Sequence, residues 1–195
     1  MNPLIKYGAI AAVIGGIVIF NGESDGYSDQ EIDLNAVLDV TVDTIYSYQD
    51  QIEASGTQEE SDALLGFSSE LQTNYNSKVP AIFEGNIGVE MRTDASFLAF
   101  DDKDSNGELS EGEDALFLIE IDGENSRVIA SSRSGAVNDH HFSGTGLLAG
   151  FLLGSILNRQ SKFGNPAGVA NKQKITSSQA NAKARAGSGS HSKGK

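Results

Sequence analysis

The chain has 195 residues, 38% of them hydrophobic, which is enough for one modest domain with additional segments. It contains no Cys, so a disulfide framework, a thiol nucleophile, a Cys-based metal site and a lipidated-Cys anchor are excluded. The formal net charge of −13 is unevenly distributed: the residues from 158 onward carry eight Lys or Arg and no acid, which leaves six basic residues against 27 acidic ones before them.

Residues 1–22 have the pattern of a signal peptide or a membrane anchor. Lys6 precedes an apolar run over residues 7–22, and acidic residues follow. A cleavable signal needs small residues one and three positions before the cut, and the end of this run, Ile19-Phe20-Asn21-Gly22, fits poorly. We therefore predict an uncleaved anchor with Lys6 on the inner side, at the short end of the lengths that span a bilayer. A buried core helix is the alternative.

Residues 23–134 are predicted to form an acidic extracytoplasmic α+β domain that begins with a pair of helices. In the first helix, apolar and uncharged residues recur at steps of three and four: Leu34, Leu38, Thr41, Ile45, Tyr48 and Ile52. The second has the same spacing at Leu64, Phe67, Leu71 and Tyr75. Ser28 with Glu31, and Thr57 with Glu60, resemble capping boxes, and Gly56 is the predicted stop between the helices. Residues 38–44 also alternate like a strand, but the length of the pattern favours a helix.

After residue 86 the sequence changes to short runs that are typical of strands. These runs cover residues 87–92, 96–100, 116–121 and 127–131, and residues 122–126 have the composition of a hairpin turn. We expect a small antiparallel sheet on which the helical pair packs, hence an α+β fold.

The most specific motif is the twelve-residue segment from Asp102 to Glu113. It places oxygen-bearing residues at positions one, three, five, seven, nine and twelve, and Gly107 at position six; the candidate metal ligands are Asp102, Asp104, Asn106, Glu108 (through its backbone carbonyl), Ser110 and Glu113. Calcium is a hard ion that prefers six to eight oxygen ligands, and a glycine at position six permits the sharp turn. Leu109, at position eight, is expected to anchor the loop to the core.

This segment resembles the calcium-binding loop of the EF-hand superfamily, over the loop alone. The resemblance implies Ca²⁺ as the bound ion. The segments on either side have the pattern of strands where EF-hands have helices, and no second loop is present to form a pair. We therefore expect a single structural loop rather than a sensor that moves a helix pair. An acidic turn that binds no ion is the alternative.

Residues 135–141 are predicted to be a linker, and residues 142–158 a second apolar, membrane-associated helix. In the latter, Gly146, Gly150 and Gly154 are four residues apart, which on a helix places them on one face where another helix can approach closely. This spacing predicts packing against the first anchor or a homo-oligomer. A short helix docked on the domain is the alternative. Residues 159–195, basic and poor in large apolar side chains, are predicted to be a disordered tail.

The sequence contains no nucleophile paired with a base, no phosphate-binding glycine loop and no zinc spacing, so we expect no enzyme. Nucleic acid is not an expected partner, because the basic tail has a single aromatic residue, Phe163. We predict a calcium-binding protein of the bacterial inner membrane, its acidic domain facing the periplasm or the outside, with a structural role or the role of recruiting a protein partner. The alternative is an oligomeric membrane-assembly or membrane-remodelling protein that works through the glycine-spaced helix and the basic tail.

Overall fold

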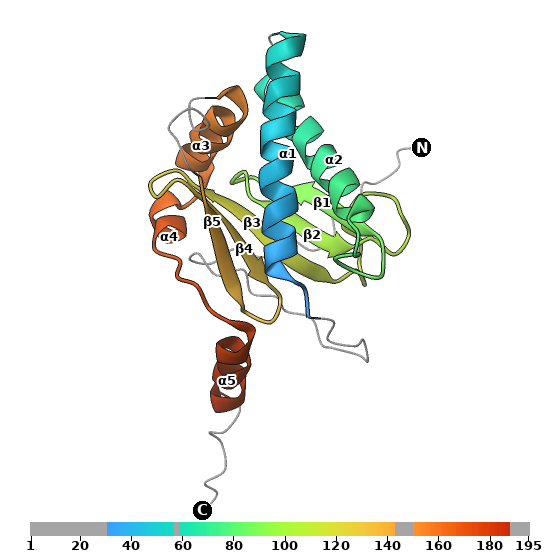
Figure 1. Cartoon of the computed structure of the whole chain (residues 1–195), viewed down its shortest axis with the longest axis vertical. Helices are drawn as coiled ribbons and strands as arrows, with labels where there is room; N and C mark the ends of the chain where they lie inside the picture. The colour runs from blue at the N-terminus through green and yellow to red at the C-terminus, as the bar shows by residue number, and fades with distance from the viewer. Residues whose placement is uncertain (1–30, 57–58, 143–149, 188–195) are drawn as a thin grey trace, which may run out of the picture.

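The computed structural model describes residues 31–56, 59–142 and 150–187 (Figure 1). The predicted membrane anchor, residues 1–22, lies outside these ranges, as do Ser28 and Thr57 of the two predicted capping boxes. Within the described residues, no helix is both long and apolar enough to cross a membrane.

The centre of the fold is a five-stranded antiparallel sheet in which the strands follow chain order. The strands are β1 (Ile87–Met91), β2 (Phe97–Asp101), β3 (Ala115–Asp122), β4 (Arg127–Ser132) and β5 (Val137–His141). Each strand pairs with the next along the chain, and a bulge interrupts the β2–β3 register between Ala99 and Phe100. The first four strands match the predicted runs to within one residue at each end, and the α+β class is confirmed.

Helices α1 (Leu34–Ser55) and α2 (Glu60–Ser77) pack on one face of this sheet, as predicted (Figure 1). Asp33 caps α1 by accepting a hydrogen bond from the Asn35 backbone N–H, and Gly56 ends the helix with a φ of 87°. The helix continues without interruption through residues 38–44, so the strand alternative is wrong there. The helices and the sheet bury Ile45, Phe67 and Phe97 between them.

The prediction of a linker at residues 135–141 is wrong, because these residues contain β5, which pairs with β4 from Val137 to His141. The strand is polar, and its one buried residue is the acid Asp139. The Arg127 guanidinium on β4 lies 2.6 Å from the Asp139 carboxylate and neutralises it. A strand held by an ion pair has no apolar alternation from which it can be recognised.

The second apolar segment contains helix α3 (Phe151–Phe163), which packs against α1 and α2. Leu152, Leu153 and Ile156 are completely buried in the common core. The described part of this segment therefore matches the alternative interpretation, a short helix docked on the domain.

The three glycines of the predicted helix face do not share a helix in the described residues. Gly150 is the extended N-cap of α3, Gly154 lies inside the helix, and Gly146 is outside the described residues. A side chain at residue 150 would collide with Gln49 on α1, so the glycine allows the start of α3 to lie close to α1 of the same chain. Gly150 and Gly154 therefore do not form one face of a helix in the described residues.

The prediction of a disordered tail is wrong for residues 159–187, which complete α3 and form α4 (Pro166–Ala170) and α5 (Ser177–Gly187). Between the last two helices, Ile175 forms an isolated antiparallel bridge with Val137 on β5. We call residues 166–175 the strap. Its lysines explain its order: Lys172 forms an ion pair with Glu120 on β3, and Lys174 lies 2.6 Å from Asp139.

Candidate metal centre

The acidic loop joins the neighbouring strands β2 and β3, as the sequence predicted. At its base, the Asp101 backbone N–H donates to the Asp114 carbonyl over 2.9 Å, which continues the ladder of the two strands into the loop. The Asp102 backbone N–H donates to the Asn86 carbonyl, also over 2.9 Å. Asp102, the first residue of the motif, is 1% exposed. The loop is thus attached to the sheet at both ends.

Three of the six predicted ligands form a compact group of carboxylates. Asp102, Asp104 and Glu113 each offer one oxygen, and these oxygens lie within 4.8 Å of one another. Calcium binds oxygens at about 2.3–2.6 Å, so two ligands on opposite sides of one ion are separated by about 5 Å. The spacing of the three carboxylates therefore suits a single ion of this size.

Backbone N–H groups of the loop direct the first and last carboxylates inward. Asp102 accepts from the N–H groups of Asn106 and Gly107, each over 3.1 Å. Glu113 accepts from Lys103 N–H over 2.9 Å and from Ser110 N–H over 2.8 Å. An ionised carboxylate has about four acceptor positions, so these contacts fix the orientation and leave capacity for a cation.

The turn at the middle of the loop depends on glycine. Gly107 has a φ of 74°, in the left-handed region that residues with a Cβ rarely adopt, and it stands at the position where the motif requires it. Ser105, at φ 58°, is also left-handed. This pair of conformations reverses the chain so that the carboxylates from both ends of the loop face one space.

The other three predicted ligands are linked to the carboxylates by hydrogen bonds. The Asn106 amide donates to Asp104 Oδ2 over 2.8 Å, and its oxygen accepts from the Glu108 N–H over 2.6 Å. The Ser110 hydroxyl donates to the Glu108 carbonyl over 3.3 Å. The loop thus brings the three acids together as a group that could hold a metal ion, and hydrogen bonds link the other three predicted residues to them.

Two residues that the sequence analysis did not single out support this loop. The Asn86 side-chain amide donates to Asp102 Oδ2 over 3.1 Å and so orients the first carboxylate from β1's side of the sheet. The Lys103 ammonium donates to the Gly112 carbonyl over 2.6 Å and lies 3.4 Å from Asp114. Asn86 stands sixteen residues before Asp102, and only the β1–β2 pairing brings them together.

One detail of the predicted loop is wrong. Leu109 was expected to anchor the loop in the core, but it is 39% exposed. The described residues contain no second acidic group of this kind against which Leu109 could pack. The loop is held instead by its attachment to β1, β2 and β3.

The electrostatics at the base of the loop favour a bound cation. Burial raises the pKa of Asp101, and the negative charges of Asp114, Glu113 and Asp102 raise it further, while Lys103 lowers it. Carboxylates that crowd one another in this way are stabilised when a positive ion enters.

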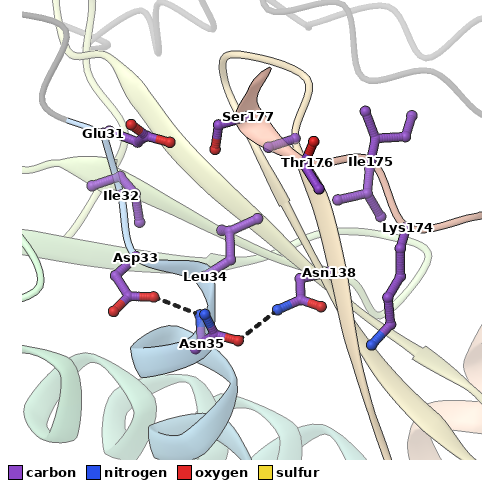
Figure 2. Close-up of a pocket in the computed structure, with 12 residues that line it drawn as sticks. Glu31, Ile32, Asp33, Leu34, Asn35, Asn138, Lys174, Ile175, Thr176 and Ser177 are labelled. Atoms are coloured by element: carbon purple, nitrogen blue, oxygen red, sulfur yellow. Dashed lines mark hydrogen bonds between the residues drawn. The ribbon is translucent and has the colours of Figure 1, made fainter. Parts of the chain in front are cut away.

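The described residues also contain a half-open cavity of about 470 Å³, distant from the loop in the fold, between the start of α1, β5 and the end of the strap (Figure 2). The Asn138 amide donates to the Asn35 side-chain oxygen across its floor over 2.8 Å. Its walls are apolar at Ile32 and Ile175 and its rim is mixed, with acids and Lys174. This lining contains no metal-binding group and no paired nucleophile and base.

Comparisons with known proteins do not place the chain in a family: no family model matches it, and neither the curated proteins nor the solved structures include a match.

Proposed function

We propose that the protein binds one Ca²⁺ ion in the loop from Asp102 to Glu113. The observation that carries this proposal is the grouping of Asp102, Asp104 and Glu113 within 4.8 Å, in a loop whose remaining positions supply oxygens in the order used by EF-type sites. Asp102 and Asp104 would bind through side-chain oxygens, and Glu113 would close the site with both carboxylate oxygens.

We further propose that the ion acts as a structural brace. The loop joins the paired strands β2 and β3, so an ion that holds its ends together also holds the β2–β3 pairing next to the bulge at Ala99. Sensor EF-hands change the angle between two helices, and strands flank this loop instead. A brace needs no conformational change, and it stabilises the folded state by its binding free energy.

The proposal is tested by a calorimetric Ca²⁺ titration of the full chain. One binding site is expected, and Glu113→Gln should remove it because the bidentate ligand loses its charge. Glu111→Gln is the matched control: it makes the same change of charge in the same loop, at an exposed position that is not a ligand. Absence of binding heat in millimolar Ca²⁺, or equal loss in both variants, would reduce the loop to an acidic turn.

The affinity would also inform the biological setting. A dissociation constant on the order of 10⁻⁴–10⁻³ M fits extracellular modules and would support the predicted location outside the cytoplasm. A constant near 10⁻⁶ M would fit a regulatory role and would contradict a permanent brace.

A further inference from the structure

The first residue of the acidic loop is attached to the start of β1. Asn86, which directly precedes β1, contacts Asp102 twice: its carbonyl accepts from the Asp102 backbone N–H over 2.9 Å, and its side-chain amide donates to Asp102 Oδ2 over 3.1 Å. The first contact fixes the position of Asp102, and the second fixes the direction of its carboxylate. A displacement of the start of β1 therefore moves an oxygen of the candidate calcium site.

The start of β1 is held in turn by helix α2. In the described residues β1 pairs with β2 on one side, and α2 packs against β1 as well (Figure 1). The Asn76 side chain on α2 bonds both backbone groups of Ile87: its oxygen accepts from the Ile87 N–H over 2.8 Å, and its amide donates to the Ile87 carbonyl over 2.8 Å. These two bonds resemble the pair that a neighbouring antiparallel strand makes in a sheet.

Two more side chains of α2 continue this row along β1. Gln72 Oε1 accepts from the Val89 N–H over 3.3 Å, and the Ser68 hydroxyl donates to the Val89 carbonyl over 2.8 Å. Ser68, Gln72 and Asn76 are four residues apart, which places them on one face of the helix. Gln72 also lies next to the loop, because a Cβ at Gly107 would stand 4.0 Å from its side-chain oxygen. The same face of α2 therefore borders both β1 and the calcium loop.

The apolar face of α2 fixes the helix independently of these polar contacts. Phe67, Leu71 and Tyr75 are at most 1% exposed and belong to the common core. Removing one polar side chain from α2 therefore leaves the helix in place and changes how the start of β1 is held. This separation makes the role of the polar row testable in a folded protein.

We propose that Asn86 and Asn76 are positioning residues of the calcium site, and that calcium binding is coupled through them to the contact between α2 and β1. This inference rests on the proposed function, because it concerns the same ion. Asn86 acts on Asp102 directly, and Asn76 acts through Ile87 and Asn86. Coupling between two sites is reciprocal, so the bound ion in turn stabilises the contact between α2 and β1.

Calcium titration of the full chain and three alanine variants tests the effect on affinity. Asn86→Ala should raise the Ca²⁺ dissociation constant about 10–100-fold, as loss of a group that orients a metal ligand typically does. Asn76→Ala should raise it about 2–30-fold, although it acts from α2. Asn74→Ala is the matched control, because this asparagine on the same helix donates to Thr44 Oγ1 on α1 over 3.0 Å. It should leave the dissociation constant unchanged.

Hydrogen exchange, measured residue by residue with NMR, tests the reciprocal effect. Ca²⁺ should slow exchange at the Ile87 and Val89 amides, which are bonded to α2, more than at the amides of α3, which report global unfolding. In Asn86→Ala at saturating Ca²⁺, the slowing at these two amides should fall to that of α3. A merely structural role of Asn86 would leave the difference in place, since the site is filled in both proteins.

The results distinguish a failure of the coupling from a failure of the calcium site. If the native chain binds one Ca²⁺ ion and neither Asn86→Ala nor Asn76→Ala weakens binding, the coupling is refuted and the calcium site is retained. Equal weakening by Asn76→Ala and Asn74→Ala would assign the effect to a general loosening of α2 and also refute it. Uniform slowing of exchange in β1 and α3 would refute the reciprocal effect. If the native chain binds no Ca²⁺, both proposals fail.

Discussion

Arg127 should be the side chain on which the strap most depends. Its guanidinium is 9% exposed and donates to Asp122 over 2.7 Å and to Asp139 over 2.6 Å. The same group donates to two strap carbonyls, those of Ala170 over 3.0 Å and Lys172 over 2.8 Å. Arg127 therefore joins β3, β5 and the strap at one buried point.

Replacing Arg127 with Met keeps an unbranched apolar stem and removes the guanidinium with all four hydrogen bonds. Loss of one partner from a buried ion pair costs about 3–5 kcal/mol, and here Asp122, 1% exposed at its side chain, loses the guanidinium, whereas Asp139 keeps Lys174. A domain of this size is stable by about 5–15 kcal/mol, so the loss is a large share of the total. Arg133→Met is the control: its guanidinium lies 2.8 Å from Asp114, but at 35% side-chain exposure that pair contributes about 1 kcal/mol or less.

Urea unfolding of the full chain, followed by circular dichroism, measures both variants. Limited trypsin digestion adds a local readout, because Arg127→Met should expose the bonds after Lys172 and Lys174 before the domain unfolds. The reasoning would be refuted if the two variants lost similar stability, below about 1 kcal/mol, and the strap bonds stayed protected in both.

Three further outcomes are expected. At 10–100 times its dissociation constant, Ca²⁺ should raise the melting temperature of the native chain by about 3–10 °C in a thermal scan, and Asp102→Asn should abolish the shift. Gly88→Ala should lower the free energy of unfolding by about 1–3 kcal/mol, because the added methyl group would overlap the Phe100 ring. Gly154→Ala in α3, where the added methyl group meets open space, should raise the free energy of unfolding by up to about 1 kcal/mol in the same urea assay. Burial opposes ionisation of Asp122, but hydrogen bonds from Asn125 and Arg127 outweigh it and lower its pKa below 3.8. As the pH falls, the unfolded chain therefore binds a proton at Asp122 before the folded chain does. The stability that Asp122 contributes is present above pH 3.8 and is lost as the pH falls through the lower pKa of the folded state. Asp122→Asn should therefore make the urea midpoint fall less steeply between about pH 5 and pH 3.

Local sequence signals predicted the parts of the fold that local interactions determine. The four apolar strands are short runs rich in apolar residues and are separated by turn residues, so each could be delimited from its own segment. The group of carboxylates that could hold a metal ion was predicted for the same reason, since one twelve-residue loop contains all of them. Asn86 was missed because its contact with Asp102 depends on strand pairing.

Long-range ion pairs determine the parts that the sequence did not reveal. In β5 the enclosed residue is Asp139, whose partners are Arg127 twelve residues earlier and Lys174 thirty-five residues later. In the strap, the compensating acid for Lys172 is Glu120, whose pKa burial raises even with that lysine beside it. A hydropathy pattern predicts that β5 and the strap are exposed to solvent, because it counts each polar side chain alone and not together with its ion-pair partner.

The same ion pairs change the argument about membrane topology. If residues 142–158 crossed a membrane, the positive-inside rule would place the basic tail on the cytoplasmic side, opposite the acidic domain. Lys172 and Lys174 instead pair with acids on the sheet, and Ile175 hydrogen-bonds with Val137 of β5. A segment that packs on the sheet must lie on the same side of any membrane as the sheet. The acidic domain and the strap therefore share one compartment, and the basic charge of the strap serves to hold the C-terminal segment on an acidic surface of the same molecule.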